Sequence, residues 1–187
     1  IIHLDLKPEN IQVNEYGEVL VLDWGFARRI NEEFPQAEHP DDVSYAPIQS
    51  NITQVGSING TPGYMSPEQA RSRANIDGRT DLFSLGCVLF ECLAGCPPYS
   101  GSHALAVIMK IALEDAPRLK EIKADVKADW DAIIHRCLQR NPEQRYQSAD
   151  ELRDTLEQLE RDLDLSTQVV TGITGYEERI TSIVLAA

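Results

Sequence analysis

The segment from residue 80 to residue 94, TDLFSLGCVLFECLA, is apolar on nearly every face of the helix that it would form. A helix of about fifteen residues is too short to span a membrane, so this pattern predicts a helix buried inside a domain. Gly95 followed by Pro97 and Pro98 marks its end, because glycine favours the C-terminal turn of a helix and proline cannot continue one. The chain is therefore expected to fold as a helical body that contains this segment.

The sequence before this segment predicts a small β-hairpin. Residues 11–22, IQVNEYGEVLVL, contain two β-rich runs separated by NEYG, whose glycine suits a turn. Residues 31–60 are rich in Asn, Gln, Ser, Pro and acidic residues without periodicity, and they predict a long loop. The stretch GTPGYMSPEQA that follows predicts a fixed irregular path ending in a short helix.

Further helices are expected after the buried segment. Residues 103–113 and 129–140 are two candidates, and a third helix begins at Ser148, which forms a capping box with Glu151. The last helix carries one apolar stripe, formed by Leu152, Leu156, Leu159 and Leu163. The predicted fold class is mainly α, of the α+β kind, with one small β-hairpin at its front edge.

Composition argues against several classes of function. The chain has 187 residues and a net charge of −13, so nucleic-acid binding, which needs the opposite sign of charge, is not expected. No apolar run approaches the length of a membrane span, and no membrane segment is expected within the chain. The cysteines form no C-x-x-C pair and fit a reducing, cytoplasmic setting. A zinc site is a weaker alternative, because structural zinc sites show tighter spacing than Cys92, Cys96, His135 and Cys137.

The first ten residues gather groups suited to phosphate chemistry. The stretch HLDLKPEN, residues 3–10, contains two acids, a lysine and an asparagine, and Asp23 follows the predicted hairpin. The hairpin would bring Asn10 and Asp23 together, and an amide oxygen with a carboxylate suits Mg²⁺. Asp5 could face a substrate hydroxyl, while Lys7 offers a positive charge to a phosphate. The alternative interpretation is an exposed charged turn without a catalytic role.

Five motifs in order resemble those of the protein kinase family. HLDLKPEN resembles the catalytic loop H-R-D-L-x-x-x-N, and DWG at residues 23–25 resembles D-F-G. SPE resembles the family's A-P-E, DLFSLG the start of its central buried helix, and RNPEQRYQSADEL its closing segment. A single motif would be weak, whereas the ordered set is specific. The resemblance covers residues 1–163 and implies the larger, C-terminal lobe of a bacterial-type serine/threonine protein kinase.

The resemblance implies a role for each matching residue of the site. Asp5 matches the catalytic base, and Lys7 matches the lysine that neutralises the transferring phosphate and so contacts ATP. Asn10 and Asp23 match the ligands of Mg²⁺, for which Mn²⁺ is an alternative, and through the metal they bind ATP. Thr61 in GTPGY matches the threonine of the substrate-binding P+1 loop that contacts the catalytic loop. Lys7 and Thr61 both favour serine/threonine over tyrosine kinases.

Other matching residues are expected to be structural. His3 resembles a packing residue of the family's hydrophobic spine, together with Trp24, which replaces the usual phenylalanine as a larger apolar filler. Asp81 is expected to anchor the backbone of the catalytic loop. Glu68 and Arg145 resemble a buried ion pair of the family.

One departure from the family pattern bears on regulation. Leu4 replaces the arginine that, in many kinases, pairs with a phosphorylated residue of the activation segment, here residues 23–68. A leucine cannot bind a phosphate, so this segment should not be ordered by such a contact.

A second departure is the content of the chain. It contains no G-x-G-x-x-G loop and no V-A-I-K lysine, so the smaller lobe of the family is expected to come from a full-length parent. The parent would phosphorylate Ser or Thr of protein substrates with ATP, whereas this chain alone is expected to be nearly inactive. Residues 164–187 predict a linker or the start of a further segment, which could lead to a membrane anchor in the parent. The alternative function is a pseudokinase or protein-interaction module.

Overall fold

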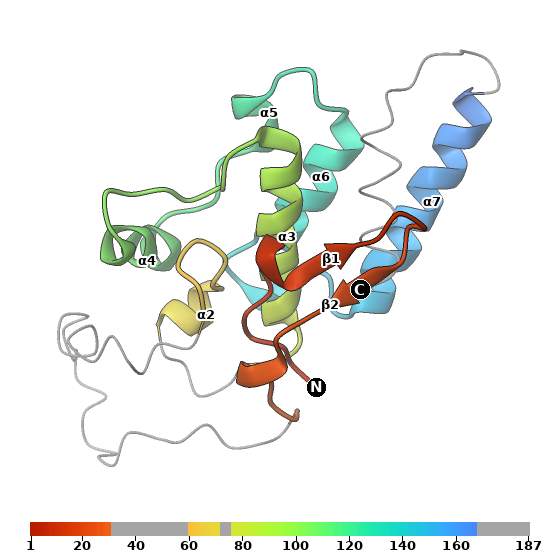
Figure 1. Ribbon diagram of the computed structural model, residues 1–187. Helices are drawn as coiled ribbons and strands as arrows, with labels where there is room; N and C mark the ends of the chain where they lie inside the picture. The colour runs from red at the N-terminus through yellow and green to blue at the C-terminus, as the bar shows by residue number, and fades with distance from the viewer. Residues whose placement is uncertain (31–59, 72–75, 168–187) are drawn as a thin grey trace.

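The computed structural model describes residues 1–30, 60–71 and 76–167, with side chains up to residue 162 (Figure 1). In this part of the chain the structure is mainly helical, with one two-stranded sheet. The described elements are η1 (Pro8–Asn10), β1 (Ile11–Val13), β2 (Val19–Val21), η2 (Trp24–Phe26), α2 (Pro67–Ala70), α3 (Arg79–Ala94), α4 (Ala104–Leu113), α5 (Leu119–Ile122), α6 (Ala128–Cys137), η3 (Pro142–Gln144) and α7 (Ala149–Thr167).

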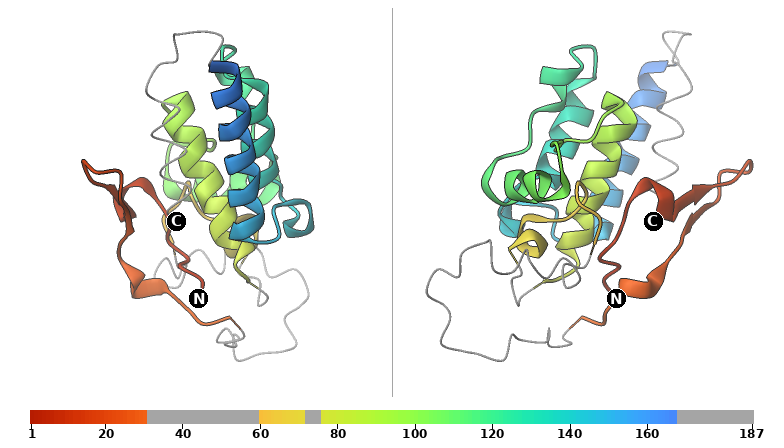
Figure 2. Two further views of the ribbon diagram at one scale, coloured as in Figure 1. Left: turned by 90° about the vertical axis from the view of Figure 1, so that its right-hand side faces the viewer. Right: turned by 60° about the vertical axis from the view of Figure 1, so that its left-hand side comes forward.

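Helix α3 lies at the centre of the helical body, as its all-round apolar character predicts. Every side chain from Leu82 to Phe90 is buried, and α3 contacts both α5 and α6. Figure 2 shows α3, α6 and α7 running side by side, with the hairpin standing apart from them. The helix ends at Gly95, whose φ of +76° is the left-handed conformation that glycine adopts without strain.

Helices α3 and α6 pack tightly against each other at Gly86. A Cβ atom placed on Gly86 would lie 2.6 Å from the Cβ of Cys137 and 3.2 Å from the Cδ2 of Leu138. Two carbon atoms do not pack 2.6 Å apart, so a side chain at Gly86 would force the two helices to shift.

Replacing Gly86 with alanine is therefore expected to lower the free energy of unfolding by about 1–3 kcal/mol, because the added methyl group overpacks the interface. Gly78→Ala is the matched control: Gly78 has helical dihedral angles, and a Cβ there would meet nothing within 4 Å. The control should shift the unfolding free energy by no more than about 0.5 kcal/mol. Urea denaturation of the two variants measures the difference, and equal stability would contradict the packing argument.

The remaining helices agree with the predicted ones to within a few residues. The predicted spans 103–113 and 129–140 correspond to α4 and α6, and Leu152, Leu156 and Leu159 of α7 are buried. The cap of α7 differs in one detail: Ser148 Oγ accepts from the Glu151 amide, but the Glu151 carboxylate accepts from the Gln147 amide instead of that of Ser148. Helix α7 continues past residue 163 to Thr167. No described helix has both the length and the apolar character that crossing a membrane requires.

The predicted hairpin is confirmed. Strands β1 and β2 pair antiparallel, with Ile11 opposite Val21 and Val13 opposite Val19. Gly17 has a φ of +82° in the turn, and Asn14 Oδ1 accepts hydrogen bonds from two turn amides. At the open end of the hairpin the Leu22 amide donates to the Asn10 carbonyl at 2.8 Å. The residues before β1 and after β2 are thereby held next to each other. Residues 31–59 of the predicted long loop at 31–60, and residues 168–187 of the predicted linker at 164–187, lie outside the described residues.

Candidate active site

The segment from His3 to Asn10 runs between the hairpin and α3 and is largely buried. Ile2 pairs with Arg28 in an isolated antiparallel bridge, which fixes the start of the segment. Pro8 stands at the first position of η1, where a missing amide hydrogen costs nothing. The side chains of Leu4 and Leu6 are buried. These contacts exclude the interpretation of the segment as an exposed charged turn.

The carboxylate of Asp5 is the centre of a polar cluster. The Lys7 ammonium lies 2.9 Å from Asp5 Oδ2, and the Thr61 hydroxyl donates to Asp5 Oδ1 at 2.8 Å. Lys7 also donates to Thr61 Oγ1 at 2.8 Å, so the three side chains close a triangle. Asp5 is 5% exposed. Asp5 and Lys7 are neighbours in the sequence, whereas Thr61, which the resemblance implied would contact the catalytic loop, reaches Asp5 from 56 residues away.

Asn10 is held by the same segment. Its Nδ2 donates to the backbone carbonyl of Asp5 at 2.9 Å and lies 3.4 Å from Asp5 Oδ2. Both of these contacts use the amide nitrogen, so in the described structure Oδ1 is the atom left to bind a cation.

Asp23 follows the residue that pairs with Asn10 across the hairpin. Its φ is +59°, a left-handed conformation that aspartate tolerates better than most residues, and its side chain accepts from the Gly25 amide at 3.3 Å. The carboxylate is exposed. Asn10 and Asp23 supply the hard oxygen donors that Mg²⁺ prefers, and their joint role as metal ligands stays a prediction.

His3 ties the segment to the end of β2. Its Nε2 lies 2.9 Å from the Leu22 carbonyl, and its Nδ1 lies 3.3 Å from the Asp5 amide. Because a carbonyl only accepts and an amide only donates, the imidazole carries its proton on Nε2 and accepts at Nδ1. The ring is buried and meets Trp24 edge-on, with ring centroids 4.8 Å apart. This geometry fits the structural role predicted for His3.

Trp24 differs from its prediction as an apolar filler, because it is 53% exposed. One edge of the indole meets His3, and its Nε1 donates to the Val21 carbonyl at 3.0 Å. These two contacts fix the ring on one side only, and the described residues do not enclose the other side.

Asp81, in the first turn of α3, anchors the backbone beside Asp5. Its Oδ2 accepts from the His3 amide at 2.7 Å, and its Oδ1 accepts from the Leu4 amide at 2.9 Å. Burial raises the pKa of Asp81 above its ordinary value, although the two amide donors act in the opposite direction. These two hydrogen bonds agree with the anchoring role predicted for Asp81.

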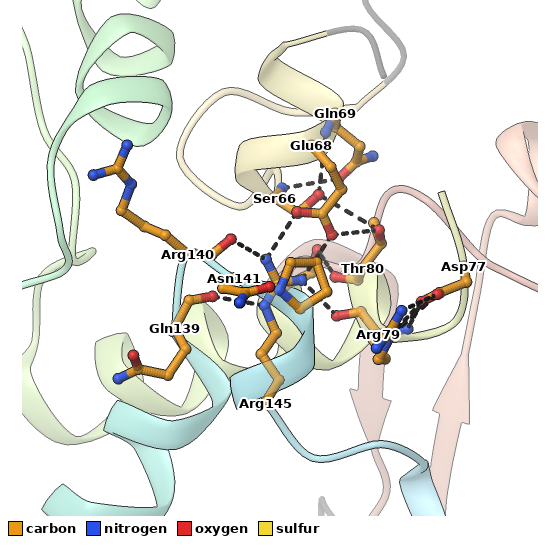
Figure 3. A network of polar contacts seen from close by, with 12 residues as sticks. Ser66, Glu68, Gln69, Asp77, Arg79, Thr80, Gln139, Arg140, Asn141 and Arg145 are labelled. Carbon is orange, nitrogen blue, oxygen red and sulfur yellow. Dashed lines mark hydrogen bonds and ion pairs between the residues drawn. The ribbon is translucent and has the colours of Figure 1, made fainter. Parts of the chain in front are cut away.

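Glu68 and Arg145 form a buried, bidentate ion pair (Figure 3). Arg145 Nη1 donates to Glu68 Oε1 at 2.7 Å, and Nη2 donates to Oε2 at 2.8 Å. The Thr80 hydroxyl donates to Glu68 Oε1 at 2.8 Å, and the guanidinium lies 4.9 Å from the centre of the Phe83 ring. Arg145 also donates to the carbonyls of Gln139, Arg79 and Arg140. The pair joins α2, the start of α3 and η3.

The charge state of this pair follows from the same contacts. Burial acts to raise the pKa of Glu68, but the hydrogen bonds and charge of Arg145 outweigh it and hold the pKa below its ordinary value. Glu68 is therefore ionised at neutral pH. The structural role predicted for both residues agrees with these contacts.

Gln69 is a residue of this region that the sequence did not single out. Its Nε2 donates to the Leu4 carbonyl at 2.9 Å, and its Oε1 accepts from the Ser66 amide at 2.9 Å. The pattern S-x-x-Q could have predicted the second contact as a capping box. Nothing local could have predicted the first, which joins residues 65 positions apart.

The zinc alternative finds no support in the described residues. None of them form a group of three or more His, Cys, Asp or Glu side chains that could hold a metal ion. Cys137 is buried in the core, and burial raises the pKa of its thiol to about 12, which disfavours the thiolate that zinc requires. Cys92 and Cys96, in contrast, are exposed.

Comparison with known proteins agrees with the motifs. The sequence pattern of the family described as "Protein kinase domain" matches residues 1–156. Serine/threonine-protein kinase PknB of Mycolicibacterium smegmatis is 38% identical over 156 residues, which are 83% of this chain and 22% of that protein. PknB of Mycobacterium tuberculosis has the same identity and coverage. A probable serine/threonine-protein kinase of Streptomyces coelicolor is 34% identical over 157 residues, 84% of this chain and 21% of that protein. The chain thus spans about a fifth of the length of these relatives.

Proposed function

Because this chain belongs to the protein kinase domain family, we propose that it carries the catalytic loop of a serine/threonine protein kinase. The reaction would transfer the γ-phosphoryl group of ATP to a Ser or Thr hydroxyl of a protein substrate. The names of the three relatives, all serine/threonine kinases, support this choice. The observation that carries the proposal is the triangle of Asp5, Lys7 and Thr61.

Asp5 is the proposed catalytic base. The substrate oxygen forms a bond to the γ-phosphorus while the bond to the ADP oxygen breaks, and the hydroxyl proton passes to the Asp5 carboxylate. Each carboxylate oxygen has two lone pairs, so Asp5 can accept this proton while keeping its contacts with Lys7 and Thr61. Asn10, bound to the Asp5 carbonyl, restricts where the carboxylate can point. Positioning of this kind supplies most of the catalysis in phosphoryl transfer.

Lys7 is proposed to neutralise the phosphoryl group during transfer. An ammonium group has three N–H donors, and the contacts with Asp5 and Thr61 use two of them. Its side chain is 21% exposed, so the remaining donor can reach a phosphate that enters from the solvent side. Thr61 links this lysine and the base to the segment proposed to bind the protein substrate.

Asn10 and Asp23 are proposed to hold Mg²⁺, with Mn²⁺ as an alternative. An amide oxygen and a carboxylate are hard donors, and Mg²⁺ is commonly held by one or two protein groups together with phosphate oxygens and water. The bound cation would supply neutralisation of charge on the ATP phosphates. The protein contributes the fixed backbone on which both ligands stand, at the open end of the hairpin.

We further propose that other elements of the nucleotide site come from a longer parent protein. Residues 1–187 contain no glycine-rich phosphate loop and no V-A-I-K lysine, so this chain alone should turn over negligibly. Several apolar side chains on and beside the hairpin are exposed, and a covering lobe would remove them from water, which supports this proposal. They are Ile1, Val13, Leu20, Leu22, Trp24, Phe26 and Ile30. The free cysteines fit a cytoplasmic setting for this reaction.

The proposal is tested by the metal dependence of phosphotransfer in the parent protein. Asp23→Asn removes one negative charge from the metal site, so the Mg²⁺ concentration for half-maximal activity should rise by about tenfold or more. Titrating free Mg²⁺ at saturating ATP and peptide measures the change.

Glu15→Gln is the matched control for this titration. Glu15 is an exposed acid in the hairpin turn, so its variant removes the same charge without altering the proposed ligands. An equal shift in both variants would show a general charge effect and contradict the metal assignment. Parent protein that binds ATP but transfers no phosphate at any Mg²⁺ concentration would favour a non-catalytic interaction module.

A further inference from the structure

We infer that Gln69 is a positioning residue of the phosphotransfer reaction, which acts on Asp5 by holding the Leu4 carbonyl; this inference rests on the proposed function. Gln69 lies in α2, directly after the activation segment of residues 23–68, and Leu4 directly precedes the proposed base. The hydrogen bond from the Gln69 side chain to the Leu4 backbone carbonyl therefore links α2 to the catalytic loop.

The side chain of Gln69 is fixed at both ends. Its Oε1 accepts from the Ser66 amide at 2.9 Å, while the Ser66 hydroxyl accepts from the Gln69 amide at 3.3 Å. This reciprocal cap sets the direction of Nε2, which donates to the Leu4 carbonyl at 2.9 Å. Gln69 is 7% exposed, so water competes little for these hydrogen bonds.

The Leu4 backbone needs such support. Its φ is +70°, in the left-handed region that a leucine seldom adopts. A conformation of this kind persists only where the surroundings determine it, and here two side chains do so. Asp81 accepts from the Leu4 amide, and Gln69 donates to the Leu4 carbonyl. Together they fix the peptide groups on both sides of Leu4, and with them the position from which the Asp5 side chain leaves the backbone.

The fit around the Leu4 carbonyl is tight. A Cβ atom placed on Gly60, whose φ is +118°, would lie 3.1 Å from the Leu4 carbonyl oxygen and 3.4 Å from Gln69 Nε2. Gly60 directly precedes Thr61, which contacts the Asp5 carboxylate. The segment from Gly60 to Gln69 thus contacts the catalytic loop at both the Leu4 carbonyl and the Asp5 side chain.

This arrangement offers a link between the two segments that needs no phosphate. The Leu4 side chain is buried and uncharged, so it cannot bind a phosphorylated residue. The Leu4 carbonyl is a backbone group that any residue would present, and the donor that reaches it, Gln69 Nε2, is supplied by α2. Gln69 therefore sets the catalytic loop in its working position whenever α2 is formed.

Gln69→Glu in the parent protein tests the inference. A glutamate keeps the size of the side chain and the capping oxygen for Ser66, but an ionised carboxylate turned toward the Leu4 carbonyl cannot donate to it. We expect kcat to fall by about 10- to 100-fold, with KM for the peptide within about twofold of the wild type. Amide hydrogen exchange in residues 3–10 should become faster by about tenfold or more, because the backbone loses one anchor.

One further variant separates positioning from simple destabilisation, and a second perturbs the same carbonyl. Ser148→Ala removes a helix cap of α7 while leaving Gln69 and the Leu4 carbonyl in place, and it should lower the thermal midpoint while kcat stays within about twofold. Gly60→Ala disturbs the same hydrogen bond from the other side, because its Cβ would crowd both the Leu4 carbonyl oxygen and Gln69 Nε2, and it should lower kcat as Gln69→Glu does. The inference is wrong if Gln69→Glu keeps its kcat, or if Ser148→Ala loses as much activity for an equal drop in thermal midpoint.

The hydrogen-exchange measurement separates this inference from the proposed function. If the wild-type parent protein showed no phosphotransfer, the proposed function would be wrong. Amide hydrogen exchange in residues 3–10 would still report whether Gln69 holds the loop. Unchanged exchange in Gln69→Glu would remove the inference while leaving the proposed function standing.

Discussion

Replacing Asp5 with asparagine is expected to lower kcat of the parent protein by about 10²- to 10⁴-fold, the range that general-base catalysis contributes. The substitution keeps the size of the side chain and an oxygen that can accept from Thr61. It removes the negative charge that accepts the substrate proton and that faces Lys7 at 2.9 Å. Steady-state transfer of phosphate to a Ser- or Thr-containing peptide, at saturating Mg²⁺ and ATP, measures the loss.

The control for this prediction is Asp125→Asn, the same change at an exposed position remote from the proposed site. It should leave kcat within about twofold of the wild type, because it contacts neither nucleotide nor peptide. Thermal midpoints of both variants establish that they are folded. If Asp5→Asn kept more than about a tenth of wild-type kcat, Asp5 would not be the base.

The second large effect is expected from Arg145→Met, which should lower the free energy of unfolding by about 3–5 kcal/mol. The substitution leaves Glu68 as a buried carboxylate without its cation, and it also removes the donor to three backbone carbonyls. Glu68→Gln should cost less, because an amide can still accept from Thr80 and from one guanidinium nitrogen. Urea unfolding at constant m-value measures both changes.

A double-mutant cycle tests whether the pair acts as a unit. Because most of the cost of Arg145→Met comes from the uncompensated Glu68 charge, adding Glu68→Leu should restore part of the lost stability. If the losses from Arg145→Met and Glu68→Leu simply add, the two side chains do not interact in solution as they do in the structure.

The same pair gives a pH dependence whose sign follows from Glu68. The pKa of Glu68 in the folded state lies below its ordinary value of 4.5, so as the pH falls the unfolded chain binds this proton first. The contribution of Glu68 to stability is present above that ordinary value and is lost as the pH falls through the folded-state pKa. Glu68→Gln should flatten this part of the acid unfolding profile. The pKa of Asp81 is raised, so its contribution to the pH dependence of stability has the opposite sign. Asp81 is present in both the wild type and Glu68→Gln, so its contribution is common to the two unfolding profiles.

The elements that the sequence predicted are those set by local patterns. The apolar run of α3, the turn glycine of the hairpin and the Ser148 cap each act within a few residues, and each appears where it was expected. The closeness of the chain at Asn10 to the chain just before Asp23 also follows from local pairing. The hairpin brings its own two ends together, and the Leu22 amide donates to the Asn10 carbonyl.

Contacts between distant segments could be predicted only through family resemblance or not at all. Asp81 and the Glu68–Arg145 pair came from resemblance, since 77 positions separate the two members of the ion pair. The exposure of Trp24 was missed because burial depends on what surrounds a side chain, and the sequence gives only its size and polarity. The bond from Gln69 to Leu4 was missed because its acceptor is a backbone carbonyl, which carries no residue-specific signal.

The central claim is that the chain carries the catalytic loop of a serine/threonine protein kinase. Phosphoamino-acid analysis after the parent protein has acted on a protein substrate with γ-labelled ATP and Mg²⁺ tests it most directly. The prediction is label on phosphoserine or phosphothreonine, dependent on Asp5. Label on neither residue, in a parent protein that binds ATP normally, would contradict the claim and place the chain among non-catalytic modules.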